Sequence, residues 1–422
     1  MSKECRNLTK TLWTPIARMF LVASLPLLPW ACEGERPSEF TTVGGAHKVP
    51  RRIVYPNEFA PGLPYSPGVL VGETLYIAGQ TDLDSQTGDQ ADEVEAQVRT
   101  AMDRMGYVLN KAGMDYGNVV TCHVYLADMA NYQTMNKVYG SYFEAGSYPA
   151  RTTLEMPRLP SGARIQVSCI AYADRSQIRV VTPRDRSAPV TKNPLSQGVW
   201  AGDRLYLAGR GGRRDDTGEF DDTVEAQTQK AMEKVGSTLA DAGLSFQHVV
   251  FANPYFLTRE SYPKLNSVWK TFFELGTAPS RASFCISRLP GPESLVQCAL
   301  VATSEVETKG RVIPQCMRTS PISSGGGVLD GDTLWTSGKS GQGETLEEQL
   351  QDSLEKIRDT LRLAGMDLEH VVQAHIYLKD VEGDMARMDA VFQENFPQNP
   401  PARTTVQVIQ DQFEQVAVVA VR

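Results

Sequence analysis

The chain has 422 residues, of which 41% are apolar and 22% are charged, and this composition is typical of a folded globular protein. Its formal net charge is −8 and it contains no long Lys/Arg block, which argues against a broad nucleic-acid surface. At about 150 residues per domain, the length predicts about three domains.

Residues 1–45 are predicted to be a leader outside the fold. A basic start is followed by the fourteen-residue apolar stretch MFLVASLPLLPWAC and then by polar residues, an order typical of an export signal. The stretch is too short to span a membrane, and Cys32 after Ala31 is a candidate lipid anchor. We therefore expect an exported, periplasmic or envelope-associated protein. The alternative is a misassigned start codon and a cytoplasmic location.

Seven cysteines are present, two of them in the leader. The other five have no regular spacing and no CxxC motif, so no disulfide framework, zinc site or redox site is expected. Cys169 and Cys298 lie in apolar strand-like runs and are predicted to be buried free thiols.

Internal repeats dominate the rest of the chain. Three hexapeptides recur 130 and 129 residues apart: LYIAGQ at 75–80, LYLAGR at 205–210 and LWTSGK at 334–339. A second glycine landmark recurs 130 and 122 residues apart: Gly113, Gly243 and Gly365, each followed closely by VV. The predicted repeats are residues 50–174, 177–304 and 310–422.

Each repeat predicts the same elements in the same order. An opening strand and a hairpin precede an amphipathic helix, with apolar residues at helical spacing such as Val98, Met102 and Met105. The landmark glycine stands where a helix C-terminus is expected. A strand, a second helix (near 131–145 in repeat one) and two closing strands follow. This order predicts the α+β class, with a mixed sheet covered by two helices on one face.

The uncovered face of each sheet needs a partner. The linkers are short, 173–176 and 303–309, so the three units are expected to meet sheet to sheet. We predict a single-chain pseudo-trimer, with sheets inward and helices outward, that is a monomer in solution.

One arginine recurs at the start of the first closing strand of every repeat, as Arg151, Arg281 and Arg403. Its planar guanidinium can bind a carboxylate through two parallel hydrogen bonds. In repeat one it opens the segment YPARTTLEMPRLPSGARIQVSCIAY, residues 148–172. The RLP that follows holds Arg158, and Arg288 in repeat two, and both are predicted to brace a loop.

These motifs resemble the closing signature of the Rid family, the reactive intermediate deaminases also labelled YjgF or endoribonuclease L-PSP. The resemblance covers about residues 50–422 as three tandem copies, although repeat three lacks RLP. Family members are homotrimers with ligand clefts between subunits. They hydrolyse enamine and imine intermediates, formed by pyridoxal-phosphate-dependent dehydratases, to 2-keto acids and ammonia.

The resemblance also implies site residues. The positions that bind substrate in the family match these residues of the chain: Arg281, Arg403, Tyr65, Gly79, Gly209, Gly338, Asn136 and Asn266. Repeat three has Asp389 at the asparagine position. The tyrosine position holds Leu195 in repeat two and lies near Ser324 in repeat three.

The family's water-orienting glutamate is missing. Its position holds Gln166 in repeat one, Val296 in repeat two and Gln415 in repeat three. Glutamine can hydrogen-bond a water molecule but cannot accept its proton, and loss of an acid–base group costs about 10²–10⁴ in rate. Arg151 and Gln166 are the catalytic candidates.

His123 and His375 share one strand position, which is Asn253 in repeat two. Without further clustered ligands we interpret them as packed strand residues, and we expect no metal and no cofactor.

The first functional hypothesis is a Rid-type imine deaminase acting on small carboxylate metabolites. The alternative is a non-catalytic module that binds small carboxylates, favoured by the missing glutamate. RNA cleavage, the older family label, is opposed by the negative charge and the lack of a basic–aromatic patch, so no nucleic-acid partner is expected.

Overall fold

The computed structural model describes residues 49–422 except 85–86, 184–192, 275 and 316. The predicted leader, with Cys32, lies outside the described residues. Within the described part, no helix is both long enough and apolar enough to cross a membrane.

Each predicted repeat forms one unit with its own sheet and two helices, as expected for the α+β class. Unit one contains β1 (Arg51–Val54), β2 (Gly68–Val71), β3 (Thr74–Ile77), β4 (Gln80–Thr81), α1 (Val94–Ala112), β5 (Val119–Leu126), α2 (Tyr132–Gly140), β6 (Ala150–Glu155) and β7 (Ile165–Tyr172). Unit two contains β8 (Ile178–Val180), β9 (Gly198–Ala201), β10 (Arg204–Gly211), α3 (Val224–Asp241), β11 (Val249–Phe256), α4 (Ser261–Trp269), β12 (Ser280–Arg281), β13 (Phe284–Cys285) and β14 (Val296–Thr303). Unit three contains β15 (Lys309–Val312), β16 (Gly327–Asp330), β17 (Thr333–Thr336), α5 (Leu346–Leu363), β18 (Val371–Leu378), α6 (Val381–Asn395), β19 (Ala402–Gln407) and β20 (Glu414–Val421).

The three sheets share one strand order. It is β1-β2-β3-β7-β5-β6 in unit one, β8-β9-β10-β14-β11-β12 in unit two and β15-β16-β17-β20-β18-β19 in unit three. The last pair of each strand order is parallel and its other pairs are antiparallel, and in unit two the short β13 also pairs in parallel with β11. The strand that carries the recurring arginine is therefore the edge strand of its sheet, where it can meet the next unit.

The predicted amphipathic helices pack on one face of each sheet. The predicted positions Met102 and Met105 of α1 are 0% exposed and Val98 is 1% exposed, and Leu354 of α5 is also 0% exposed. The landmark glycines adopt the left-handed conformation at the helix ends, with φ of 83°, 81° and 72° at Gly113, Gly243 and Gly365. A side chain with a Cβ is disfavoured there, so the predicted C-terminal role is confirmed. Helix α2 is shorter than predicted, ending at Gly140.

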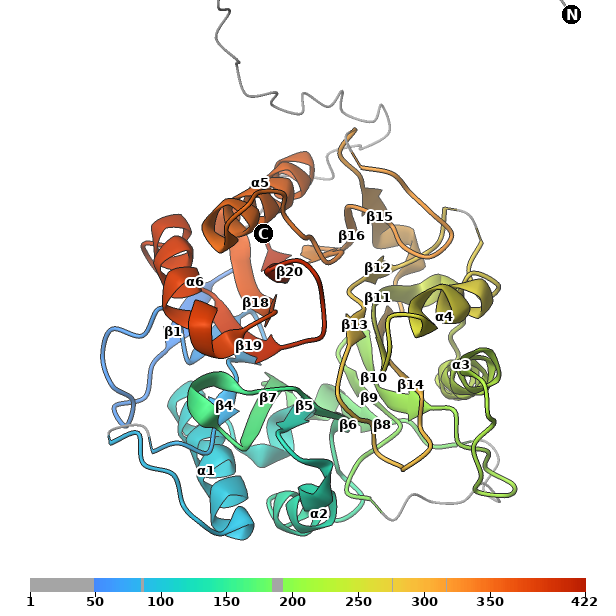
Figure 1. Cartoon of the computed structure of the whole chain (residues 1–422), viewed down its shortest axis with the longest axis horizontal. Coiled ribbons are helices and arrows are strands. Elements are labelled where there is room, and N and C mark those ends of the chain that lie inside the picture. The colour runs from blue at the N-terminus through green and yellow to red at the C-terminus, as the bar shows by residue number, and fades with distance from the viewer. Residues whose placement is uncertain (1–48, 85–86, 184–192, 275, 316) are drawn as a thin grey trace, which may run out of the picture.

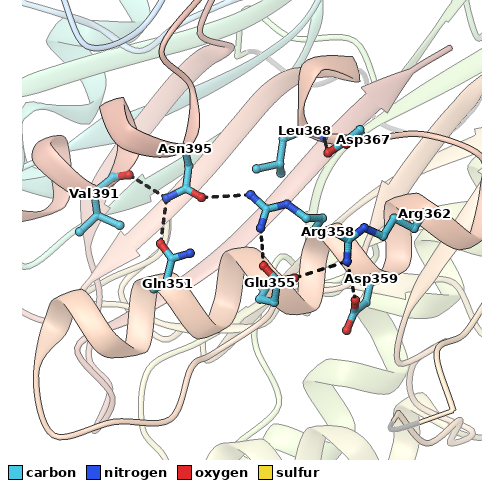
Figure 2. A network of polar contacts seen from close by, with 9 residues as sticks. All are labelled: Gln351, Glu355, Arg358, Asp359, Arg362, Asp367, Leu368, Val391 and Asn395. Atoms are coloured by element: carbon cyan, nitrogen blue, oxygen red, sulfur yellow. Dashed lines mark hydrogen bonds and ion pairs between the residues drawn. The ribbon is translucent and has the colours of Figure 1, made fainter. Parts of the chain in front are cut away.

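The two helices of unit three are also joined by a polar network on the outer surface (Figure 2). Asn395 of α6 donates to Gln351 of α5 at 2.9 Å and accepts from Arg358 at 3.3 Å, and Arg358 pairs with Glu355. Exposed pairs of this kind contribute only about 0–1 kcal/mol each. The network therefore aligns the helices, and the buried apolar core beneath supplies most of the stability.

The three units surround a common centre, with their helices on the outside (Figure 1). Their inner sheet faces form one apolar cluster, to which the units contribute large residues such as Tyr76, Tyr206 and Trp335. The predicted pseudo-trimer arrangement is confirmed.

Backbone contacts close each junction between units. The segment before each hairpin runs beside the arginine strand of a neighbour, through the bridges Ser66–Ala402 and Ala150–Ser196. The RLP loops add cross-unit bonds, because Glu155 N–H donates to the Arg288 carbonyl and Gln407 N–H to the Arg158 carbonyl. These bonds use the backbone carbonyls of Arg158 and Arg288, so a loop-bracing role of the two side chains stays a prediction.

The structure corrects the prediction for Cys169, which forms a disulfide with Cys122. The two residues are direct partners on the antiparallel strands β5 and β7, with Cα atoms 4.2 Å apart. Sequence spacing could not show this, because the pairing depends on strand register. Cys298 is a buried free thiol, as predicted.

Removing this bond should lower the free energy of unfolding measurably. The bond closes a separation of 47 residues, and a native disulfide of this kind contributes about 2–4 kcal/mol. The partners at the same position are Ala374 and Val418 in unit three, so Cys122→Ala/Cys169→Val is a matched apolar replacement. In urea unfolding, a reductant should lower the free energy of unfolding of the wild type and leave that of the double variant unchanged. An unchanged free energy of unfolding in the fully reduced wild type would contradict the prediction.

Candidate functional site

The three recurring arginines lie at the junctions between units and are almost fully buried. Arg151, Arg281 and Arg403 expose 2%, 5% and 3% of their surface. We name the junctions after them: the Arg151 junction joins units one and two, the Arg281 junction units two and three, and the Arg403 junction units three and one. Each guanidinium is held by the second helix of its own unit and by aromatic rings.

At the Arg151 junction the contacts come from α2. Arg151 Nη2 donates to Asn136 Oδ1 at 2.5 Å, and the guanidinium lies 4.8 Å from the Tyr139 ring centre. The Asn136 amide donates in turn to Asn193 of unit two at 3.4 Å. The arginine therefore has a neutral amide as its oriented partner.

The Arg281 junction repeats this pattern. Arg281 Nη2 donates to Asn266 Oδ1 and Nε to Ser283 Oγ, both at 2.6 Å. Its Nη1 donates to the Ile322 carbonyl of unit three at 3.4 Å, and the Trp269 ring centre lies 4.8 Å away. Burial lowers the pKa of Arg281 to about 10, so the side chain is still a cation at neutral pH.

The Arg403 junction differs because its partner is an acid. Asp389 Oδ1 of α6 lies 2.6 Å from Arg403 Nη2. The guanidinium is 5.0 Å from both the Phe392 and Tyr65 ring centres. Tyr65 comes from unit one, and burial raises its pKa while the Arg403 charge acts in the opposite direction. Tyr65 therefore packs against Arg403 of unit three. Arg151, which is in the same unit as Tyr65, lies at a different junction.

The predicted glycines hold the junctions close. Gly79 N–H donates to the Arg403 carbonyl and Gly338 N–H to the Arg281 carbonyl, both at 3.0 Å. A Cβ on Gly79 would come within 2.7 Å of the Gln166 side chain. A larger residue at position 79 would therefore force the Gln166 side chain to shift.

The same close approach recurs in all three units. Gly209 contacts Gln297 and Gly338 contacts Gln415 as Gly79 contacts Gln166. Gln166 is thus part of the Arg403 junction, so the two catalytic candidates Arg151 and Gln166 do not share one site.

The structure also corrects Val296 as the residue at the glutamate position. Gln297 stands opposite Tyr255, as Gln166 stands opposite Tyr125 and Gln415 opposite Tyr377. The loop after RLP is one residue longer in repeat two, so a fixed offset from the arginine selects the wrong residue. All three units carry glutamine.

Unpartnered polar atoms gather at these positions. The side-chain oxygens of all three glutamines are buried without a hydrogen-bond partner, as are Thr153 Oγ1 and Thr405 Oγ1. Buried polar groups normally have a partner, so orphaned groups beside a cationic side chain are typical of a ligand site. Sequence reasoning found the arginines and glycines, did not select the threonines as site residues, and missed Gln297.

The two strand histidines lie elsewhere, around a central cavity of about 50 Å³ between the sheets. His123, His375 and Asn253 line it from the three units. Burial lowers the pKa of His123 to about 4 and that of His375 to about 3. The described residues contain no group of three or more His, Cys, Asp or Glu side chains arranged to hold a metal.

Three sheets joined by arginine-bearing edge strands define a class of protein built as a trimer of one unit. The family model described as endoribonuclease L-PSP matches residues 56–173, 185–304 and 323–418. The chain therefore belongs to the Rid family, in three tandem copies.

Individual relatives match one copy at a time. A human 2-iminobutanoate/2-iminopropanoate deaminase is 39% identical over 115 residues, which is 26% of this chain and 83% of the relative. Reactive Intermediate Deaminase A from Arabidopsis thaliana is 34% identical over 139 residues, 32% of this chain and 74% of the relative. Among solved structures, a putative endoribonuclease L-PSP from Entamoeba histolytica is 32% identical, with 29% of this chain covering 99% of that chain at a TM-score of 0.27.

Proposed function

We propose that this protein hydrolyses imines of small 2-keto acids, releasing the keto acid and ammonia. The observation that carries the proposal is the buried guanidinium at each junction, fixed in place beside a glycine and an unpartnered glutamine oxygen. The names of the matched relatives, which are imine deaminases, support the same reaction.

The arginine's role is to bind and orient the substrate. Its fork binds the substrate carboxylate, and this places the adjacent C=N carbon for attack by water. Water adds to that carbon and one of its protons passes to the nitrogen, which gives a carbinolamine. The remaining hydroxyl proton then passes to the nitrogen as the C–N bond breaks, leaving the keto acid and ammonia. The carboxamide of Gln166, Gln297 or Gln415 can accept a hydrogen bond from the attacking water but cannot remove its proton.

A second candidate function is binding without catalysis. It is favoured by one observation, the glutamine at the glutamate position of all three units. In that case the junctions would hold a small carboxylate without converting it.

An assay of keto-acid release separates the two candidates. With a pyridoxal-phosphate-dependent threonine dehydratase supplying the imine, the wild type should accelerate keto-acid release. Arg151→Ala/Arg281→Ala should reduce the acceleration at these two junctions by about 10- to 100-fold, since each charge-assisted bond contributes about 1.5–3 kcal/mol, and should leave at most the contribution of the Arg403 junction. Arg151→Lys/Arg281→Lys is the matched control, which keeps both charges but loses the fork.

Each outcome of the assay has one meaning. Full acceleration by the alanine variant would contradict the role of the arginines. Carboxylate binding by the wild type without any acceleration would support the second candidate.

We also propose that the protein is exported, as its leader sequence indicates. The buried Cys122–Cys169 disulfide supports this, because such bonds persist mainly in oxidising compartments. Cell fractionation with sequencing of the mature N-terminus tests it, and a full-length chain in the cytoplasm would contradict it.

A further inference from the structure

The three junctions carry unequal charge. The arginine's partner on the second helix is Asn136 in α2, Asn266 in α4 and Asp389 in α6. Asp389 occupies the same place as Asn136, because the methionine before each one, Met388 and Met135, contacts Nη1 of its arginine in the same way. At this position of the second helix, the Arg403 junction thus has a carboxylate where the other two have a neutral amide.

The difference changes the charge that a ligand meets. Arginine is a permanent cation, and an amide partner orients it without neutralising it. Among the described residues, no ion pair is recorded for Arg151 or Arg281. A ligand carboxylate at either junction would be the counter-ion of a buried charge, which is a strong driving force for binding.

At the Arg403 junction the counter-ion is already present. Asp389 pairs with the guanidinium at 2.6 Å, and Arg403 exposes 1% of its side chain. A second carboxylate there would compete with Asp389 for the same cation and would be repelled by it at short range. The other cation near Tyr65 is Arg104, whose Nη1 donates to the Leu83 carbonyl and whose guanidinium lies 4.7 Å from the Phe59 ring centre.

We propose that Asp389 is a specificity-determining residue that closes the Arg403 junction to carboxylates, so that the chain binds two carboxylate ligands, at the Arg151 and Arg281 junctions. This inference rests on the proposed function, in which junction arginines bind carboxylates. It implies that the junction with the family's tyrosine, Tyr65, is the one that does not take a carboxylate substrate.

Isothermal titration of the full chain with 2-oxobutanoate tests the inference by counting sites. The wild type should bind two equivalents. Asp389→Asn should bind three, because it gives the third junction the partner found in the other two. Asn136→Asp, the reverse change, should bind one, with affinity at the altered junction reduced by at least about tenfold.

The outcomes separate the two proposals. Three equivalents in the wild type, or no added site in a folded Asp389→Asn, would overturn this inference alone. No binding to the wild type or to any variant would overturn the proposed function and, with it, this inference. If Asp389→Asn fails to fold, the count for Asn136→Asp decides: two remaining equivalents would overturn the inference.

Discussion

Replacing Arg204 with alanine should destabilise the folded chain by about 3–5 kcal/mol, because it leaves the carboxylate of Asp330 buried without its cation. Arg204 begins β10 of unit two, and Asp330 ends β16 of unit three. Their Nε and Oδ2 atoms are 2.9 Å apart, and Arg204 Nη2 also donates to the Asp330 carbonyl. The Asp330 side chain exposes only 1% of its surface, so water cannot replace the lost partner.

The other units supply the matched control for this variant. In the same hairpin positions, Arg204 corresponds to Thr74 and Thr333, and Asp330 corresponds to Ala201 in unit two. Arg204→Thr/Asp330→Ala therefore removes both charges and leaves residues that the fold already accepts. Urea unfolding should show the double variant to be clearly more stable than Arg204→Ala. A loss below about 1 kcal/mol in Arg204→Ala would show that the ion pair does not hold these units together.

The fold could be predicted because its signals are local and occur three times. Gly113 is required by a helix end, which is a local feature of the backbone, and landmark glycines such as Gly79 recur at nearly constant spacing. Their spacing alone separates the three units. The helix faces followed in the same way from apolar residues at helical spacing.

The composition of the site could be predicted only in part, because each junction combines two units. Tyr65 and Arg151 are close in sequence and share a repeat, yet Tyr65 packs on Arg403. Gln297 was missed because one inserted loop residue shifts the offset from Arg281. The Cys122–Cys169 bond depends on strand register, which no pattern of spacing in a single sequence reveals.

Acid should destabilise this protein steeply between pH 6.5 and 4 because of two buried histidines. Burial lowers the pKa of His123 to about 4, and burial together with the charge of His123 lowers the pKa of His375 to about 3. In the unfolded chain both would titrate near pH 6.5. The folded pKa values are depressed, so the contribution of the two neutral histidines to stability is fully present above pH 6.5. It is lost at lower pH as the histidines of the unfolded state take up protons.

The size of the effect follows from the linkage relation. Each histidine costs about 1.4 kcal/mol per pH unit within the window, so the two together cost about 5 kcal/mol by pH 4.5. The cavity that they share is lined by neutral groups, including Thr121, Ser168 and Gln373, and no carboxylate is present there to stabilise a protonated ring.

The corresponding residue of unit two shows which substitution to use. Asn253 stands where units one and three have histidine. His123→Asn/His375→Asn therefore introduces a residue that the fold already accepts at this position. Urea unfolding from pH 8 to pH 4.5 should give the double variant a flatter profile of unfolding free energy against pH than the wild type.

Glu414 acts in the opposite direction, since burial raises its pKa to about 7 and its ionisation costs stability as the pH rises from about 4.5. Because both proteins keep Glu414, the difference between their profiles isolates the histidines, and parallel profiles would show that the two rings are not the groups that take up protons on unfolding.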